Sequence, residues 1–257
     1  MKTHGRRLRR FFSDSQLSRS GDIIFLNQSE THHLRHALRL QRGDRCLVVD
    51  GEGRQGEAVI LDLDDQKTTL KVEKIAWEGM PSLVIRAIVA LPQKGKMDFL
   101  VEKAQEVGLD GFWPMVTERT EVRFPDSKVG KVMERWERIT QEAAKQSGAV
   151  NRMEILAPQS FSQAVERAQK DSRVIVFHPS KEAVLLKDWL TGFDADFRSK
   201  KGPGALSFLL GPEGGFSAQE MGIVRERQCE QVSLGKTILK VDTAFLAASG
   251  ILRLWFP

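Results

Sequence analysis

The stretch LLGPEGGFS, residues 209–217, places three glycines, a proline and one glutamate directly after an apolar run. The apolar run at 206–210 predicts a buried strand. Glycine permits the positive φ values of a hard turn and lets another molecule approach the main chain. Ser217 and Glu220 have the S-x-x-E spacing of a capping box, which predicts that a helix starts there. Strand, glycine turn and helix N-terminus together predict the floor of a pocket with free backbone N–H groups.

Similar apolar runs recur through the second part of the chain, as LVIRAIVAL (83–91), GFWPMV (111–116), RVIVF (173–177) and ALSFLL (205–210). Continuous runs of this kind are typical of strands covered on both faces, as in a parallel sheet. Apolar residues at helical spacing lie between the strands, at 97–107 and again at 132–143. The alternation predicts an α/β domain over residues 77–257.

The first part of the chain has shorter strand signals. DIIFL, RCLVVD, GEAVILDL and TTLKVEKI are rich in β-branched residues and are separated by Gly, Asp and Asn. The segment THHLRHALRLQRGD, between the first two of these, predicts one short helix. We therefore expect a small β-rich barrel or sandwich over residues 1–76, followed by the linker WEGMP, whose proline favours an extended Met80.

Length and composition fit a soluble globular protein. The 257 residues are enough for one large domain or two smaller ones. No apolar run approaches the roughly 20 residues of a membrane span, and the N-terminus lacks the apolar segment of a signal peptide. The two cysteines, Cys46 and Cys229, lie far apart in sequence. This argues against a disulfide scaffold and for a reducing compartment, so we expect a cytoplasmic protein without membrane contact.

Positive charge is concentrated near the N-terminus. Residues 1–45 hold ten Lys/Arg against four Asp/Glu, whereas the whole chain has a net charge of only +5. Four of the five histidines lie in the same segment. The pattern fits either a solvated basic tail or a surface that faces phosphates. Arg35, Arg39, Arg42 and Arg45 extend the basic character beyond the tail and favour nucleic acid.

Three local patterns resemble known motifs without fulfilling them. GEGRQG at 51–56 has GxGxxG spacing, but a strand pattern follows it, so a hairpin turn is favoured over a dinucleotide site. GKT at 235–237 lacks the earlier glycine of a P-loop. His32 and His36 are four residues apart, but the HExxH form and a third ligand are missing, so we expect no metal site.

A second glycine-containing turn, VSLGKTILKVDTA at 232–244, follows another strand signal. Ligands of open α/β sheets bind outside the carboxyl ends of the strands. Two neighbouring turns could clamp a flat heteroaromatic ring through main-chain hydrogen bonds, with apolar walls from Leu210, Leu234, Ile238 and Leu239. From the pattern alone, two ordinary strand–helix turns are an equally good interpretation.

LLGPEGGFSxxE followed by VSLGxxIL resembles the 16S ribosomal RNA uridine-N3 methyltransferases of the SPOUT class. The resemblance covers almost the whole chain, because three further blocks occur in the family's order. THHLRHALRLQRGD is similar to the N-terminal segment, QKGKMDFLVEKAQEVGLDGFWPMVTERTEV to the first α/β unit, and RWERITQEAAKQSG to the helix after it.

The resemblance implies a PUA-like β-barrel RNA-binding domain over 1–76 and a SPOUT α/β domain over 77–257, whose parallel sheet, with helices on both faces, includes a trefoil knot. It implies S-adenosyl-L-methionine between the two glycine turns, a homodimer, and methylation of N3 of one uridine in ribosomal RNA, within the assembled small subunit. The implied cofactor-binding residues are Leu210, Gly211, Glu213, Gly214, Gly215, Leu234, Gly235, Ile238 and Leu239. The expected RNA-binding residues are Arg7, Arg9, Arg10, His32, Arg35, Arg39, Lys94, Arg119 and Arg123.

Catalytic roles are expected for Lys240, Asp242 and Glu213. Uridine N3 bears a proton that Asp242 or Glu213 could accept, while Lys240 could stabilise charge on the flanking carbonyl oxygens. The family commonly has ILRTETA where this chain has ILKVDTA at 238–244, so a lysine replaces arginine and an aspartate replaces glutamate. A methyltransferase for another RNA base, and an RNA-binding protein that has lost catalysis, stay open as alternatives.

The stretch DTAFLAASGILRLWF at 242–256 predicts a helix that is apolar nearly all round. Its own sheet can cover only one side, so a second subunit is the expected cover for the other. On this interpretation Ala248→Glu should yield monomers or insoluble protein.

Overall fold

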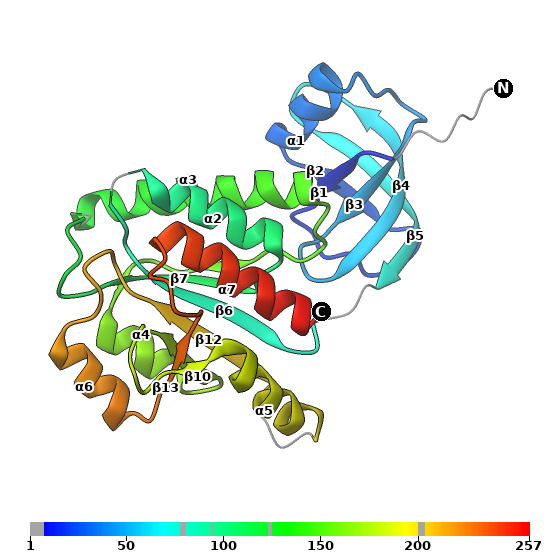
Figure 1. The fold of residues 1–257 in the computed structure, drawn as a ribbon. Coiled ribbons are helices and arrows are strands. Elements are labelled where there is room, and N and C mark those ends of the chain that lie inside the picture. Colours follow the sequence, from blue (N-terminus) through cyan, green and yellow to red (C-terminus); the bar gives the residue numbers. More distant parts are fainter. Residues whose placement is uncertain (1–7, 78–80, 94, 123–124, 200–203) are drawn as a thin grey trace. The chain divides into compact units, whose positions relative to one another are not determined.

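The computed structural model describes residues 8–77, 81–93, 95–122, 125–199 and 204–257 (Figure 1). Residue contacts divide the chain into two units, each described separately below. The first unit comprises Met1–Met80 and Ala144–Arg152, and the second comprises Pro81–Ala143 and Met153–Pro257. In the described part of the chain, no helix is long and apolar enough to cross a membrane.

The first unit is built on a five-stranded sheet with the order β1-β3-β4-β5-β2. Its strands are β1 (Arg10–Phe12), β2 (Ile23–Leu26), β3 (Arg45–Val49), β4 (Arg54–Leu63) and β5 (Thr68–Trp77). β1 runs parallel to β3, and the other neighbours are antiparallel. All four predicted strands are confirmed, and β1 is an additional one. The buried core between them includes Phe11, Leu26, Val48, Ile60, Leu70 and Val72.

The connection between β2 and β3 is helical, as predicted, but it is not one regular helix. α1 (Gln28–His32) begins where the Asn27 side chain accepts a hydrogen bond from the Glu30 backbone N–H at 3.0 Å. A π-helical turn, η1 (His33–Ala37), follows directly. Between β3 and β4 the chain forms the predicted hairpin turn, in which Gly51 and Gly53 have φ values of 78° and 92°.

The segment Ala144–Arg152 belongs to the first unit through specific contacts. Lys145 forms an ion pair with Glu30, whose side chain is 1% exposed. A buried carboxylate requires such a partner, because an isolated charge is costly to remove from water. In addition, the Arg152 backbone N–H donates to the Gly51 carbonyl at 3.0 Å. These contacts join residues from distant parts of the sequence into one unit.

The second unit contains a parallel sheet with the order β11-β13-β10-β12-β6-β7-β8, and β9 also pairs with β7. The four predicted strands are confirmed as β6 (Val84–Ala90), β7 (Gly111–Val116), β10 (Arg173–Phe177) and β12 (Ala205–Leu210). The remaining strands are short: β8 (Glu154–Ile155), β9 (Gln159–Ser160), β11 (Val184–Leu185) and β13 (Glu230–Ser233). The α/β class with a parallel sheet is therefore confirmed, while the knotted path of the chain stays a prediction.

Helices cover both faces of this sheet, which explains why its strands are continuously apolar. α2 (Lys96–Val107), α3 (Asp126–Ser147), α5 (Leu186–Arg198) and α7 (Val241–Trp255) supply residues to one apolar core. α4 (Phe161–Ala168) and α6 (Ala218–Glu226) supply residues to the other. Figure 1 shows α2 and α7 on one face and α4 and α6 on the opposite face. In β10, Ile175 and Phe177 point to the first core, and Val174 and Val176 to the second.

α7 confirms the helix predicted at the C-terminus, whereas the expected outcome of Ala248→Glu, monomers or insoluble protein, would have a different cause from the one predicted. Ala248 is fully buried against its own sheet, together with Phe245 and Leu252. A glutamate at position 248 would therefore disrupt the core of the subunit itself, and it would not report on association. The apolar residues that α7 leaves exposed are Leu246, Ile251, Leu254 and Trp255.

Candidate functional site

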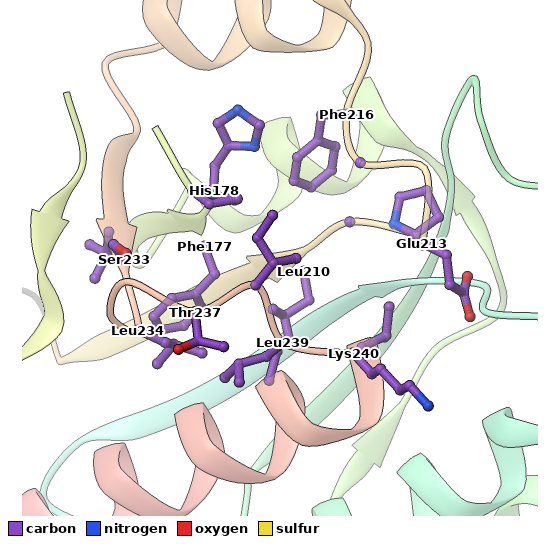
Figure 2. A pocket seen from close by; sticks show the side chains of 18 of the residues that line it. Phe177, His178, Leu210, Glu213, Phe216, Ser233, Leu234, Thr237, Leu239 and Lys240 are labelled. Atoms are coloured by element: carbon purple, nitrogen blue, oxygen red, sulfur yellow. The ribbon is translucent and has the colours of Figure 1, made fainter. Parts of the chain in front are cut away.

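A pocket of about 350 Å³ opens at the carboxyl ends of β10, β12 and β13 (Figure 2). A pocket of this size is typical of small-molecule sites, and the edge of the sheet is the one where such sites form. Four segments line it: the residues that end β10, the loop after β12, the loop after β13, and the first turn of α7. The lining residues are Phe177, His178, Pro179, Leu210, Gly211, Pro212, Glu213, Gly215, Phe216, Val232, Ser233, Leu234, Gly235, Thr237, Ile238, Leu239, Lys240, Val241 and Ala244.

The loop after β12 turns sharply at its glycines. The Gly215 backbone N–H donates to the Pro212 carbonyl at 2.8 Å, and Gly215 has φ +69°, which few residues other than glycine adopt. A Cβ at Gly211 would lie 3.2 Å from the Phe216 ring, so the ring packs directly on the glycine backbone. Phe216 is itself buried against Phe161 of α4, with ring centroids 5.5 Å apart. These contacts hold the loop close to the sheet and leave its inner side to the pocket.

The helix that follows the loop starts as the sequence predicted. Ser217 caps α6, since its hydroxyl accepts from the Glu220 N–H at 3.2 Å and its own N–H donates to Glu220 Oε2 at 2.8 Å. The second carboxylate oxygen, Oε1, accepts from the backbone N–H of Glu118 at 2.9 Å. Glu220 is buried, and both of its oxygens are thus used to fix backbone groups.

The loop after β13 forms the opposite wall. The Gly235 N–H donates to the Ser233 hydroxyl at 3.2 Å, and Gly235 has φ +135°. A Cβ at Gly235 would have no atom within 4 Å, so open space lies beside this backbone. Leu234 and Leu239 are partly buried apolar walls, whereas Ile238 is 83% exposed and lies at the mouth.

The end of β10 supplies a wall that the sequence reasoning missed. Phe177 and His178 line the pocket, and the His178 backbone N–H donates to the Val232 carbonyl at 3.1 Å, which joins β10 to β13. Burial lowers the pKa of His178, because removal from water disfavours the charged imidazolium. The run RVIVF followed by HP, another strand that ends in a turn, is the signal from which this wall could have been found.

The predicted cofactor-binding residues all line this pocket except Gly214. The loop packs the backbone of Gly214 beside Arg119, on a different side of the turn, and a Cβ there would lie 3.5 Å from Arg119 Cβ. The structure thus brings together two turns that are about twenty residues apart in sequence. Their role in holding a cofactor stays a prediction.

The predicted catalytic residues are only partly brought together. Lys240 and Glu213 line the pocket and lie on the same side of it in Figure 2. Glu213 also forms an ion pair with Lys96, with Oε1 and Nζ 3.4 Å apart. Asp242 is not a lining residue; it lies in the first turn of α7, where its Oδ1 accepts from the Thr243 N–H at 3.1 Å.

The predicted RNA-binding residues fall into different environments. Arg7, Lys94 and Arg123 lie outside the described residues. Arg9, His32 and Arg39 are exposed, and the His32 ring lies 4.5 Å from that of His36. Arg35 forms an ion pair with Asp65, and Arg10 donates to Gln55 at 2.5 Å. Arg119 donates from Nη1 to the Gly214 carbonyl at 2.8 Å. Direct contact with RNA stays a prediction for all of them.

No group of three or more His, Cys, Asp or Glu side chains that could hold a metal ion occurs among the residues that the structure describes. The pocket offers main-chain groups, apolar walls, one amine and one carboxylate at its side, and the half-buried imidazole of His178. Such a lining suits an organic ligand with a flat apolar part.

Two protein families match the chain. The RNA methyltransferase domain matches residues 80–253, and the RNA methyltransferase PUA domain matches residues 26–73. The chain therefore belongs to the RNA methyltransferases, with a PUA domain in its N-terminal part. Both matches agree with the α/β pocket unit and with the N-terminal sheet described above.

Similar proteins narrow the family further. The ribosomal RNA small subunit methyltransferase E of Synechocystis sp. is 31% identical over 86% of this chain and 69% of its own length. The Bacillus subtilis protein of the same name is 28% identical over 85% of each chain. Among RNA methyltransferases, the chain is a member of the ribosomal RNA small subunit methyltransferase E family.

Solved structures agree with this assignment. The chain resembles a ribosomal RNA small subunit methyltransferase E from Neisseria gonorrhoeae bound to S-adenosyl methionine, with a TM-score of 0.81, 27% identity, and coverage of 97% of this chain and 98% of that one. A methyltransferase from Legionella pneumophila has a TM-score of 0.82 at 23% identity, which extends the agreement in fold. The α/β fold with a parallel sheet and an N-terminal PUA domain is confirmed, while the trefoil knot stays a prediction.

Proposed function

We propose that this protein transfers a methyl group from S-adenosyl-L-methionine to N3 of a uridine in 16S ribosomal RNA. The observation that carries the proposal is the pocket at the carboxyl ends of β10, β12 and β13, formed by the two glycine turns that the methyltransferase resemblance singles out. Family membership supports the reaction class, and the similar Neisseria gonorrhoeae structure was obtained with S-adenosyl methionine bound.

The residues present fit this cofactor. Open space lies where a Cβ would be at Gly215 and Gly235, so both turns can admit a ligand next to the main chain. Leu210, Leu234 and Leu239 supply apolar surface for a flat ring system. When bound, S-adenosylmethionine supplies an electrophilic methyl group on a sulfonium.

The chain's own residues would position the acceptor and manage its proton. Lys240 at the pocket side stabilises the negative charge that develops on the uridine carbonyl oxygens as N3 loses its proton. Asp242, two residues after Lys240 in the first turn of α7, does not line the pocket and would accept that proton from a uridine bound at its edge, passing it to solvent. Glu213 braces its own turn through Lys96, and this contact leaves it a weaker candidate for the base. The products are N3-methyluridine and S-adenosylhomocysteine.

RNA binding is assigned to the N-terminal domain predicted over residues 1–76. The PUA domain match and the basic balance of residues 1–45 support this assignment. Exposed cations such as Arg9 and Arg39 contact phosphates, which supply affinity without sequence information. The target uridine would be selected by the shape of the folded small subunit, and the reaction would take place in the cytoplasm.

A homodimer is part of the proposal. Among the described residues of α7, Leu246, Ile251, Leu254 and Trp255 are exposed although they are apolar. A contiguous apolar helix face is normally covered in the functional assembly. A second copy of the chain, packing the same face of α7, would cover it and would bring two pocket units together.

Two measurements test the proposed function. S-adenosylmethionine at 100 times its Kd should stabilise the protein by about 2.7 kcal/mol in thermal unfolding. Labelled methyl should then be transferred to small subunits from cells that lack the enzyme, and mass mapping of the RNA should locate one N3-methyluridine. Stabilisation without transfer to 16S RNA would point to another RNA base. Absence of both would favour an RNA-binding protein without catalysis.

A further inference from the structure

The turn after β7 contacts the loop after β12 (residues 211–217) and the start of α6, although it does not line the pocket. Thr117–Thr120 is a tight turn of its own, in which the Thr117 N–H donates to Thr120 Oγ1 at 3.0 Å and the Thr120 N–H donates to the Thr117 carbonyl at 3.2 Å. Both threonines are buried. The two central residues of the turn, Glu118 and Arg119, are thus presented from a rigid base.

Both central residues donate hydrogen bonds to the segment 211–220. The Glu118 backbone N–H donates to Glu220 Oε1 at 2.9 Å, and Arg119 Nη1 donates to the Gly214 carbonyl at 2.8 Å. The Arg119 stem also lies along Gly214, where a Cβ would be 3.5 Å from Arg119 Cβ and 3.6 Å from Cδ. One bond therefore fixes the helix end of the segment, and the other fixes the glycines.

The position of the second bond gives it a role in ligand binding. Gly214 lies between Glu213 and Gly215, which both line the pocket. The peptide group that joins Gly214 to Gly215 carries the carbonyl held by Arg119 and the N–H that donates to Pro212. Glycine has many accessible backbone conformations. A loop with two adjacent glycines therefore needs such external contacts to hold its backbone in a single conformation.

We propose that Arg119 is a positioning residue: by holding the Gly214 carbonyl it keeps residues 211–217 in the conformation that receives S-adenosylmethionine. The identity of the ligand rests on the proposed function, whereas the restraint on the loop does not. The sequence-based prediction placed Arg119 on RNA, but its hydrogen bond directs the guanidinium to the protein's own loop. A competent loop conformation that is populated tenfold less would weaken ligand binding tenfold.

The contact should affect binding more than folding. Arg119 is exposed, so water can replace its hydrogen bond to the carbonyl when the side chain is removed. Arg119→Ala should therefore leave the fold intact and raise the Kd for S-adenosylmethionine about tenfold, measured by calorimetry without RNA. At saturating cofactor kcat should stay unchanged while the KM for cofactor rises. Arg119→Lys, which keeps a donor but loses the planar fork, should recover part of the affinity.

The matched control is Arg225→Ala, which removes the same charge from an exposed position on α6. It should bind cofactor like the wild type. Hydrogen exchange of the Gly215 amide, read without ligand, should accelerate in Arg119→Ala only. The exchange rate tests the role of Arg119 even if the wild type fails to bind S-adenosylmethionine. Failure of the wild type to bind would contradict the proposed function and not the restraint on the loop. Two results would overturn the role of Arg119. One is that Arg119→Ala leaves both the Gly215 exchange rate and the Kd for S-adenosylmethionine unchanged. The other is that Arg119→Ala lowers only the affinity for RNA and its salt dependence.

Discussion

Two adjacent glycines of the loop after β12 should respond very differently to the same substitution. Gly215 has φ +69°, in the left-handed region that alanine adopts only at a cost of roughly 1–2 kcal/mol. Gly214 does not have a positive φ, and a Cβ there would make an ordinary contact with Arg119 at 3.5 Å. Gly214→Ala is therefore a control with the same chemical change one residue away.

The magnitude follows from the backbone and from the space around each glycine. Gly215→Ala should lower the free energy of unfolding by about 1–2 kcal/mol, which for a chain of this size is roughly 2–8 °C in Tm. A Cβ at Gly215 would meet no atom within 4 Å, so the cost is conformational strain and not a clash. Because Gly215 lines the pocket, the added methyl and the altered turn should also weaken S-adenosylmethionine binding at least about tenfold.

Thermal unfolding without ligand and titration calorimetry with S-adenosylmethionine measure the two effects separately. Gly214→Ala should remain within about 0.5 kcal/mol of the wild type in stability, as expected for a surface change without strain. If Gly214→Ala lost as much stability and affinity as Gly215→Ala, the left-handed turn would not be the cause. A specific role of Gly215 in cofactor binding would then be refuted as well.

Four further changes probe other parts of the protein. Leu254→Glu, at a position 85% exposed on α7, should convert the dimer to folded monomers in sedimentation, whereas Gln219→Glu on α6 should not; a monomeric wild type at micromolar concentration would contradict the dimer. Arg9→Ala should weaken RNA binding and reduce the salt slope of log K by about one, without changing cofactor affinity. Lys240→Ala should lower kcat by a factor of about 10²–10³, whereas Lys240→Arg should retain most of the wild-type kcat. Equal kcat in the wild type and both variants would exclude charge stabilisation by Lys240. Because burial lowers the pKa of His178, the folded protein binds a proton at this imidazole less well than the unfolded chain does. The free energy of unfolding should therefore fall as the pH drops below about 6.5. His178→Phe should flatten this dependence in unfolding measured between about pH 7.5 and 5.

Several strands and helices could be predicted because their causes are local. The runs at 83–91 and 205–210 carry apolar residues on both faces of a strand, interrupted by Arg86 and Ser207, and a strand covered on two sides explains this pattern. The Ser217–Glu220 capping box is closed by atoms three residues apart and appears in the structure as expected. By contrast, β8, β9 and β11 have only two residues each, and it is pairing with a neighbouring strand that defines them.

The candidate site shows the same division. Glycine turns, apolar walls and the nearby Lys240 could be read from the sequence, since backbone freedom and residue type are properties of each residue in its local segment. Two features arise only when parallel strands place their carboxyl ends side by side. They are the pocket wall formed by Phe177 and His178, and the hydrogen bond from Arg119 to the Gly214 carbonyl.

The sequence by itself determined the longer strands, several of the helices and the two glycine turns, and the family resemblance added the reaction class. The tertiary structure decided which side chains meet across those segments. It buried Ala248 in its own subunit and left Leu254 exposed, although both are apolar residues of the same helix. It also turned Arg119 toward a loop ninety-five residues away. Helical periodicity sets the relative angle of two residues, but only packing against the sheet sets which angle points inward.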